Sequence, residues 1–157
     1  MDRRDFLHVT ALAPLALTTD AMSGGAPPPD WGRLRGRLAG TLVLPGDAGY
    51  DSARRLRNPA YDRIRPGGVA YCANAGDVST CLAFARTTGV PVTVRSGGHS
   101  YAGWSTGTGL VIDVSRMNKV DYTAGRATVG AGAKLIDVYD RLARHGVSIP
   151  AGSCPTV

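Results

Sequence analysis

A glycine-rich loop directly after an apolar strand is the feature that most constrains this chain. Val90 to Arg95 has the pattern of a β-strand, and the next residues read Ser-Gly-Gly-His-Ser. Adjacent glycines let the backbone approach a ligand and turn successive N–H groups inward, which forms a nest for anions such as phosphate. Ser96 and Ser100 add hydroxyl donors, and Arg95 adds a charge. Taken alone, the loop predicts either a phosphate site or a plain turn with a surface histidine, His99.

The loop differs from the dinucleotide fingerprint of Rossmann folds because no helix pattern follows it. Glycines continue at Gly103, Gly107 and Gly109, up to an apolar run at 110–114 that predicts a buried strand. Backbone N–H groups of the loop, rather than a helix dipole, would therefore hold a phosphate here.

The hydrophobic pattern predicts a small α+β fold, a mixed sheet with flanking helices. Residues 45–66 look irregular, with turn signals and no clear period. Strands are expected at 69–73, 90–95, 110–114, 127–130 and 147–149. Helices are expected from the N-cap Asp30 to Leu38, from the N-cap Asp77 to the terminal glycine Gly89, and from Leu135 to the stop at Gly146.

The basic charge of the chain does not point to nucleic acid. The 157 residues are enough for one domain with a core. They carry a formal net charge of +6. The arginines are scattered, and only Arg54, Arg55 and Arg57 cluster, which is typical of a solvated face. The sequence therefore predicts no nucleic-acid partner.

The N-terminus has the features of an export signal. Arg3 and Arg4 form a twin-arginine pair, and a short apolar run follows at 9–17. This run is too short to span a bilayer, and no later segment is apolar enough to do so. We expect residues 1–26 to be a twin-arginine signal peptide that directs the chain to the periplasm or the exterior. The alternative is an ordinary amphipathic N-terminus, against which Pro14 argues.

The three cysteines divide into a pair and a single residue. The spacing of Cys72 and Cys81 fits neither a zinc knuckle nor a redox motif, so inert burial is expected for both and no metal site is predicted. Cys154 lies in a Gly-Ser-Cys-Pro turn, where it could be an inert buried residue or a reactive thiol held near a ligand. An odd count in an exported protein favours another use for at least one thiol.

Taken together, the loop and the Cys154 turn resemble the berberine-bridge-enzyme-like group of FAD-linked oxidases. These belong to the flavoproteins named after vanillyl-alcohol oxidase and p-cresol methylhydroxylase (PCMH). The resemblance runs from about residue 38 to 157 and is carried by an ordered set of motifs. They are Pro45-Gly46-Asp47 with Tyr50, Asn58-Pro59-Ala60-Tyr61, Asp77-Val78, Phe84-Ala85-Arg86, residues 92–101, Leu110–Asp113, Val129–Gly132, His145–Val147 and Gly152–Pro155.

The resemblance implies a bicovalent FAD. His99 would bond to the 8α-methyl group of the isoalloxazine ring, and Cys154 to C6 of the same ring. Tyr101 and Trp104 either pack on the cofactor or lie in the core, and core packing is the expected role of each aromatic ring. The other residues expected at the cofactor are Arg95, Ser96, Gly97, Gly98, Ser100, Gly103 and Gly152, of which several would line the pyrophosphate.

The activity implied is that of an oxidase. A hydride would pass from an alcohol, a sugar or a specialised metabolite to the flavin, and the electrons would go to dioxygen. No catalytic base is assigned, because the family's second glycine-rich stretch and its substrate-binding sheet have no match here. The alternatives are a truncated, non-catalytic fragment that cannot hold FAD alone and a phosphate-binding module, although phosphate binding needs neither His99 nor Cys154. The expected organisation is a signal peptide at 1–26, a helix and irregular lead-in at 27–66, and an incomplete PCMH-type FAD-binding domain at 67–157.

Overall fold

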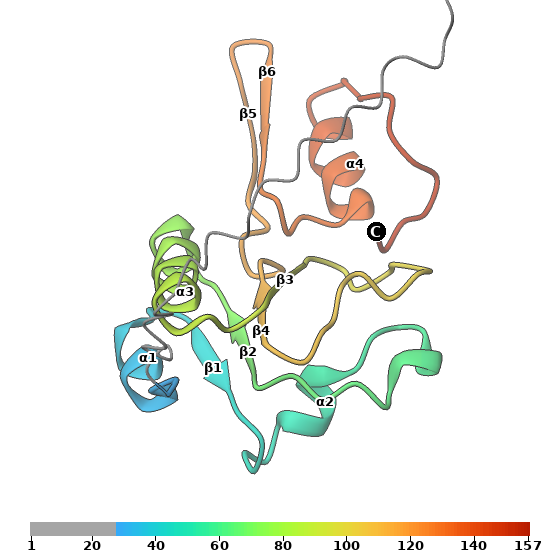
Figure 1. Ribbon diagram of the computed structural model, residues 1–157. Coiled ribbons are helices and arrows are strands. Elements are labelled where there is room, and N and C mark those ends of the chain that lie inside the picture. Colours follow the sequence, from blue (N-terminus) through green and yellow to red (C-terminus); the bar gives the residue numbers. More distant parts are fainter. Residues whose placement is uncertain (1–27) are drawn as a thin grey trace, which may run out of the picture.

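The computed structural model describes residues 28–157, and the signal peptide expected at 1–26 lies outside them. The chain forms the mixed α+β fold that the sequence predicts (Figure 1). Within the described residues no helix is long and apolar enough to cross a membrane. The elements are α1 (Trp31–Arg37), β1 (Thr41–Val43), α2 (Tyr50–Arg54), a 3₁₀ turn (Pro59–Tyr61), β2 (Gly68–Tyr71), α3 (Ala75–Thr88), β3 (Val92–Arg95), β4 (Leu110–Asp113), β5 (Val120–Thr123), β6 (Arg126–Val129) and α4 (Leu135–Ala143).

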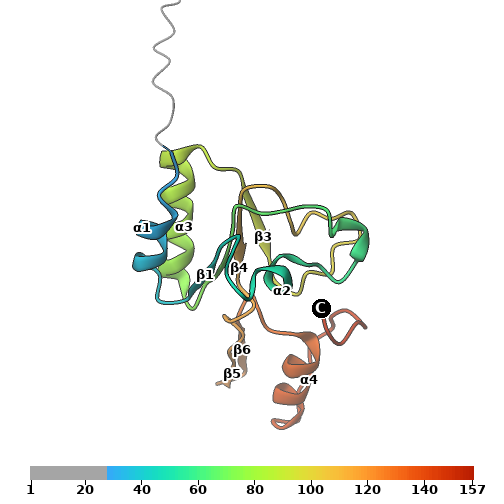
Figure 2. The same cartoon turned by 90° about the horizontal axis from the view of Figure 1, so that it is seen from below.

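A four-stranded sheet forms the centre of the molecule, in the order β1-β2-β4-β3. Strands β2, β4 and β3 run parallel, and β1 pairs antiparallel with β2. Helices α1 and α3 cover one face, while α2 lies against the other (Figure 2). Side chains alternate between the two faces, so that Ala70 and Ile112 pack under α1 and α3, whereas Val69 and Val111 pack against Ala53 of α2.

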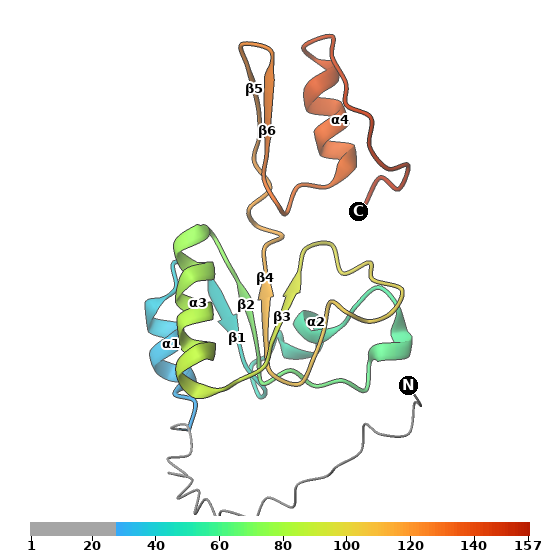
Figure 3. The same ribbon diagram turned by 45° about the horizontal axis from the view of Figure 1, so that its top comes forward.

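The hairpin β5–β6 and helix α4 stand beyond the carboxyl end of β4 (Figure 3). The hairpin turn consists of Ala124 and Gly125, both with positive φ (50° and 77°), which is the geometry of a type I′ turn. Helix α4 buries Val138 and Leu142 and contacts β5. This part of the molecule is less buried than the sheet.

Helix α3 starts one turn earlier than predicted. Asn74 is the N-cap, and its side chain accepts a hydrogen bond from the N–H of Asp77 at 3.0 Å. Asp77 lies within the first turn, is buried, and accepts bonds from the N–H groups of Ala39, Gly40 and Ala73, each at 2.9 Å. The prediction of Asp77 as the cap was wrong because its carboxylate joins the helix to the chain before β1 and after β2.

Four further differences from the predicted pattern concern β1, α2, β5 and residues 147–149. Strand β1 and helix α2 lie in or beside the region expected to be irregular, and β1 extends the sheet, so the lead-in shares the sheet's core. Strand β5 was not anticipated either. The strand expected at 147–149 does not form, because Gly146 (φ 69°) ends α4 and Val147 donates its N–H back to the carbonyl of Leu142 at 3.2 Å.

Candidate functional site

The glycine-rich loop begins at the carboxyl end of β3 and presents free backbone donors. Between Ser96 and Ala102, no backbone N–H donates a hydrogen bond to another of the residues 28–157. Gly98 has a φ of +70°, a conformation that glycine adopts without strain and that turns successive N–H groups together. A run of unused donors in this conformation is the arrangement that binds an anion such as a pyrophosphate.

The structure brings His99 and Cys154 into one pocket, although they lie far apart in the sequence. The pocket has a volume of about 270 Å³. Cys154 is exposed, and the His99 ring lies close to Gly97, where an added Cβ would meet its Cδ2 at 2.9 Å. A groove of about 300 Å³ between α1 and α3 is slightly larger, yet it holds neither His99 nor Cys154. The smaller pocket is lined by Arg57, Asn58, His99, Ser100, Tyr101, Cys154 and Val157.

The tail that carries Cys154 is held by helix α4. The N–H groups of Leu135 and Ile136, at the start of the helix, donate to the carbonyls of Val157 (2.8 Å) and Pro155 (3.0 Å). The hydroxyl of Tyr139 donates to the carbonyl of Gly152 at 2.8 Å. Gly152 itself is exposed and does not line the pocket, so the structure gives its backbone a part in holding the tail.

Arg95 lies beneath the loop rather than in the pocket. Its Nε donates to Asp113 at 2.6 Å and its Nη2 to the carbonyl of Ala53 at 2.7 Å, while the side chain is almost fully buried. The charge expected for phosphate is therefore paired within the fold. The Nη1 atom of Arg95 is buried without a partner among the described residues. The geometry makes Arg95 a residue that positions the loop from below.

Gly103 is also held inside the loop. An added Cβ would lie 2.4 Å from the ring of Tyr61, so glycine lets the loop pack on this ring. The Tyr61 hydroxyl donates to the carbonyl of Tyr101 at 2.8 Å. Core packing of Tyr101 and Trp104 was a wrong prediction, since they are 91% and 81% exposed, and Tyr101 lines the pocket. The loop turns both rings outward because its backbone packs inward on Tyr61.

Arg57 and Asn58 are pocket residues that sequence reasoning missed. The arginine cluster was expected to be a solvated face, but Arg54 is buried and bonds to Asp51 and to the carbonyl of Asp62. Arg57 makes no side-chain hydrogen bond or ion pair within residues 28–157, and its N–H donates to Gly98 at 3.4 Å. The sequence offers no signal that separates Arg57 from its neighbours.

Residues 66–157 match the FAD binding domain family. The chain belongs to this family. The resemblance to FAD-linked oxidases and the predicted PCMH-type fold are thereby confirmed. The loop offers unused N–H groups, and the pocket offers the imidazole of His99 and the thiol of Cys154. These groups fit FAD.

Relatives with established and unestablished roles share this region. The uncharacterized FAD-linked oxidoreductase YgaK of Bacillus subtilis is 36% identical over 124 residues, which cover 77% of this chain and 27% of YgaK. The (R)-6-hydroxynicotine oxidase of Paenarthrobacter nicotinovorans is 32% identical over 123 residues, covering 76% of this chain and 27% of that enzyme. The chain thus spans about a quarter of the length of these relatives.

A solved structure supports the same assignment. BBE-like 1 of Physcomitrella patens superposes with a TM-score of 0.73 and 30% identity, covering 80% of this chain and 28% of the moss protein. The matched region is again only a small part of the solved protein. The common fold is therefore that of the FAD-binding part of these proteins.

Proposed function

We propose that this chain is the flavin-anchoring part of an FAD-dependent oxidase, and that His99 and Cys154 attach the cofactor through two covalent bonds. The observation that carries the proposal is their meeting in one pocket beside a loop of unused N–H donors. Neither residue is needed for phosphate binding, so a module without redox chemistry would leave the pair unexplained.

Each residue of the site has a definite part in this proposal. The N–H groups between Ser96 and Ala102 hold the pyrophosphate, and Arg57, whose guanidinium has no partner within residues 28–157, adds positive charge at the pocket. With FAD bound, a ring nitrogen of His99 would bond to the 8α-methyl carbon and the sulfur of Cys154 to C6. Each attachment would remove one hydrogen from the side chain and one from the flavin carbon, and the two electrons would pass to dioxygen.

FAD, when bound, supplies a ring that accepts a hydride from a substrate C–H bond. The substrate class that we propose is an alcohol, a sugar or a specialised metabolite, with dioxygen as the final acceptor. Support comes from the relatives, which include (R)-6-hydroxynicotine oxidase and other FAD-linked oxidoreductases. We assign no catalytic base to any described residue.

A second candidate is a chain that does not retain FAD by itself. The open character of the site favours it, because Cys154 is exposed and Tyr101 is 91% exposed beside the pocket. In this case the oxidase function belongs to a longer polypeptide that contains the same region.

Intact mass and visible absorbance of the purified chain, produced with riboflavin available, separate the two candidates. The anchoring proposal predicts a yellow chain whose mass includes FAD after acid denaturation. A colourless chain at the mass of the polypeptide alone would contradict anchoring and support the second candidate. Replacing the exposed His145, outside the pocket, with Ala provides a control that should keep the flavin.

We also propose that the twin-arginine residues Arg3 and Arg4 direct export of the folded chain. This route suits a protein that must fold before it attaches its cofactor. Replacing both arginines with lysine should retain the chain in the cytoplasm, and unchanged export would contradict the proposal.

A further inference from the structure

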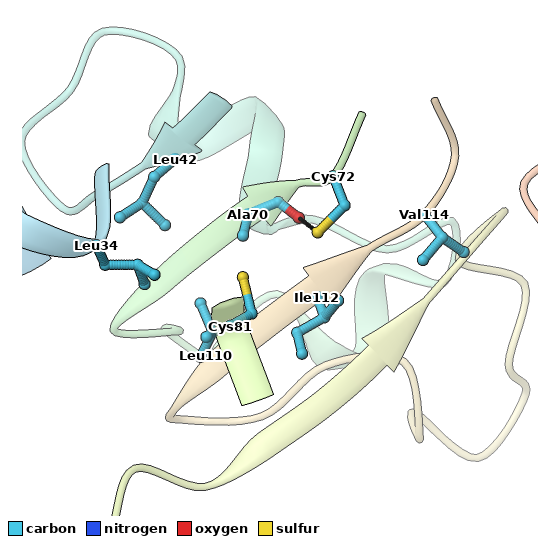
Figure 4. Packing of buried hydrophobic residues seen from close by; sticks show 8 residues of the cluster. All are labelled: Leu34, Leu42, Ala70, Cys72, Cys81, Leu110, Ile112 and Val114. Atoms are coloured by element: carbon cyan, nitrogen blue, oxygen red, sulfur yellow. Dashed lines mark hydrogen bonds between the residues drawn. The ribbon is translucent and has the colours of Figure 1, made fainter. Parts of the chain in front are cut away.

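Two thiols that the flavin site does not use meet between the sheet and helix α3. Cys72 directly follows β2, and Cys81 lies on the buried face of α3. Both have 0% exposure and belong to one hydrophobic cluster with Leu34, Ala70 and Ile112 (Figure 4). The third cysteine, Cys154, is exposed in the tail that follows α4.

The two sulfur atoms point into the same part of this core. Figure 4 shows the Cys72 sulfur turned back along β2, 3.8 Å from the carbonyl oxygen of Ala70, and the Cys81 sulfur directed from the helix toward the strand. The neighbouring Cys72 thiol, together with burial, raises the pKa of Cys81 above its usual value. Both thiols are free, and among the described residues their one hydrogen bond joins Cys72 to the carbonyl of Ala70.

The sequence spacing of Cys72 and Cys81 did not predict that the two thiols lie close together. Cys72 and Cys81 are separated by the turn that connects β2 to α3, and Asn74 and Asp77 fix the direction of the helix there. The βα connection lays the helix back over the strand it follows. Two cysteines at the end of a strand and on the inward face of the next helix are thus brought together by the fold.

We propose that Cys72 and Cys81 form a disulfide bond when the chain folds in the presence of a small-molecule disulfide such as oxidised glutathione. In this exchange the two S–H bonds and the glutathione S–S bond break, and one S–S bond forms between the cysteines. The two electrons and two protons go to glutathione, which leaves as two thiols. Because the folded core seals both sulfur atoms, the exchange takes place before α3 closes over β2.

The bond would join the end of β2 to α3, at the junction that Asp77 already holds. Such a cross-link restricts the unfolded chain and so stabilises the folded one. It acts on the sheet that carries the glycine-rich loop, and it is independent of flavin attachment.

Peptide mapping tests the proposal on the full chain. The unfolded, reduced protein is refolded with reduced and oxidised glutathione, alkylated in denaturant, and cut by a protease that cleaves before aspartate. Cleavage at Asp62, Asp77 and Asp113 places the two thiols in separate peptides, 62–76 and 77–112. We expect these peptides to be recovered joined and to separate on reduction, while Cys154 is found in a peptide of its own.

The same peptides recovered singly, each with the alkyl label, would overturn the proposal, as would a link from either thiol to Cys154. A Cys154→Ser chain serves as a control, because removing the exposed thiol should leave the joined peptides unchanged. Melting gives a second reading: added reductant should lower the melting temperature of the oxidised wild type by several degrees and leave Cys81→Ala unaffected. An equal response of both chains would contradict a stabilising cross-link.

Discussion

The central sheet and the β5–β6–α4 region hold their parts of the pocket of His99 and Cys154 in different ways. In the sheet, Val69, Leu110 and Val111 are fully buried, and the loop with His99 rests on the buried pair of Arg95 and Asp113. In the other region β6 is largely exposed, and Ile136 of α4 is 50% exposed. The sheet thus positions His99 through packing and a buried ion pair. The tail positions Cys154 through a few hydrogen bonds to α4.

If FAD is attached at both residues as proposed, this difference predicts that the two attachments depend on different parts of the chain. Attachment at His99 should follow the stability of the sheet, because the loop continues directly from β3. Attachment at Cys154 should follow the contacts between α4 and the tail, which lie at the surface. Substitutions in one region should therefore change one attachment more than the other.

The largest effect is expected for Arg95→Ala, which leaves Asp113 buried without its partner. Breaking a buried ion pair in this way costs roughly 3–5 kcal/mol. Arg144→Ala is the matched control in α4, because its pair with Asp140 is exposed and contributes at most about 0.5 kcal/mol. Urea unfolding of both chains measures the contrast. Similar losses for the two variants would break the comparison between the regions.

Gly103→Ala should come next. Its φ of +74° and the ring of Tyr61 at 2.4 Å from an added Cβ combine backbone strain with overpacking, roughly 2–4 kcal/mol together. Gly125→Ala in the hairpin has a φ of +77° but open space around it, so strain alone should destabilise it by roughly 1–2 kcal/mol. Thermal melts of the pair give the difference. An equal shift would mean that Tyr61 does not fix the loop.

Asp77→Asn tests the junction between the sheet and α3. Burial alone would raise the pKa of Asp77, but the N–H groups of Ala73, Ala39 and Gly40 lower it below its usual value. The substitution should destabilise the chain by about 1–3 kcal/mol at neutral pH, since an amide satisfies these donors less well. The wild-type contribution is present above the unfolded pKa of about 3.9 and is lost as the pH falls through the lower folded pKa.

The gap in unfolding free energy between wild type and Asp77→Asn should therefore shrink as the pH is lowered through that window. Denaturant unfolding at a series of pH values measures it. A gap that stays constant down to the lowest pH would show that the carboxylate charge plays no part at this junction.

Tyr139→Phe should have the smallest effect on stability, about 0.5 kcal/mol, because it removes one exposed hydrogen bond to Gly152. It should slow flavin attachment at Cys154, measured in a His99→Ala background, since the tail loses a contact. Attachment at His99, measured in a Cys154→Ala background, should keep its rate. Equal slowing of both would refute the separation of the two regions.

Much of the fold could be predicted from local patterns. Asp30 caps α1, Gly89 (φ 72°) ends α3, and the glycine-rich loop follows β3 as expected. The local patterns gave wrong predictions where contacts between distant segments determine the structure. Asp77 has the residue type of an N-cap but is used to join three segments. The alternation at 147–149 has no neighbouring strand among the described residues.

The site shows the same limit. The residue types of His99 and Cys154 pointed to a flavin through resemblance, but only the fold shows that the two line one pocket. Arg57 could not be separated from Arg54 by sequence, because the difference lies in the tertiary contacts: Arg54 is buried and bonds to Asp51, whereas Arg57 lines the pocket. Tyr101 was misplaced because an aromatic residue in a loop gives no indication of the direction of its ring.

The central claim, that His99 and Cys154 anchor one FAD together, is tested most directly by the acid-stable mass of four chains. These are the wild type, His99→Ala, Cys154→Ala and the double variant. The account predicts that FAD remains on the wild type and on each single variant through the other residue, with altered visible spectra, and is lost only from the double variant. Acid-stable FAD on the double variant, or complete loss from either single variant, would contradict it.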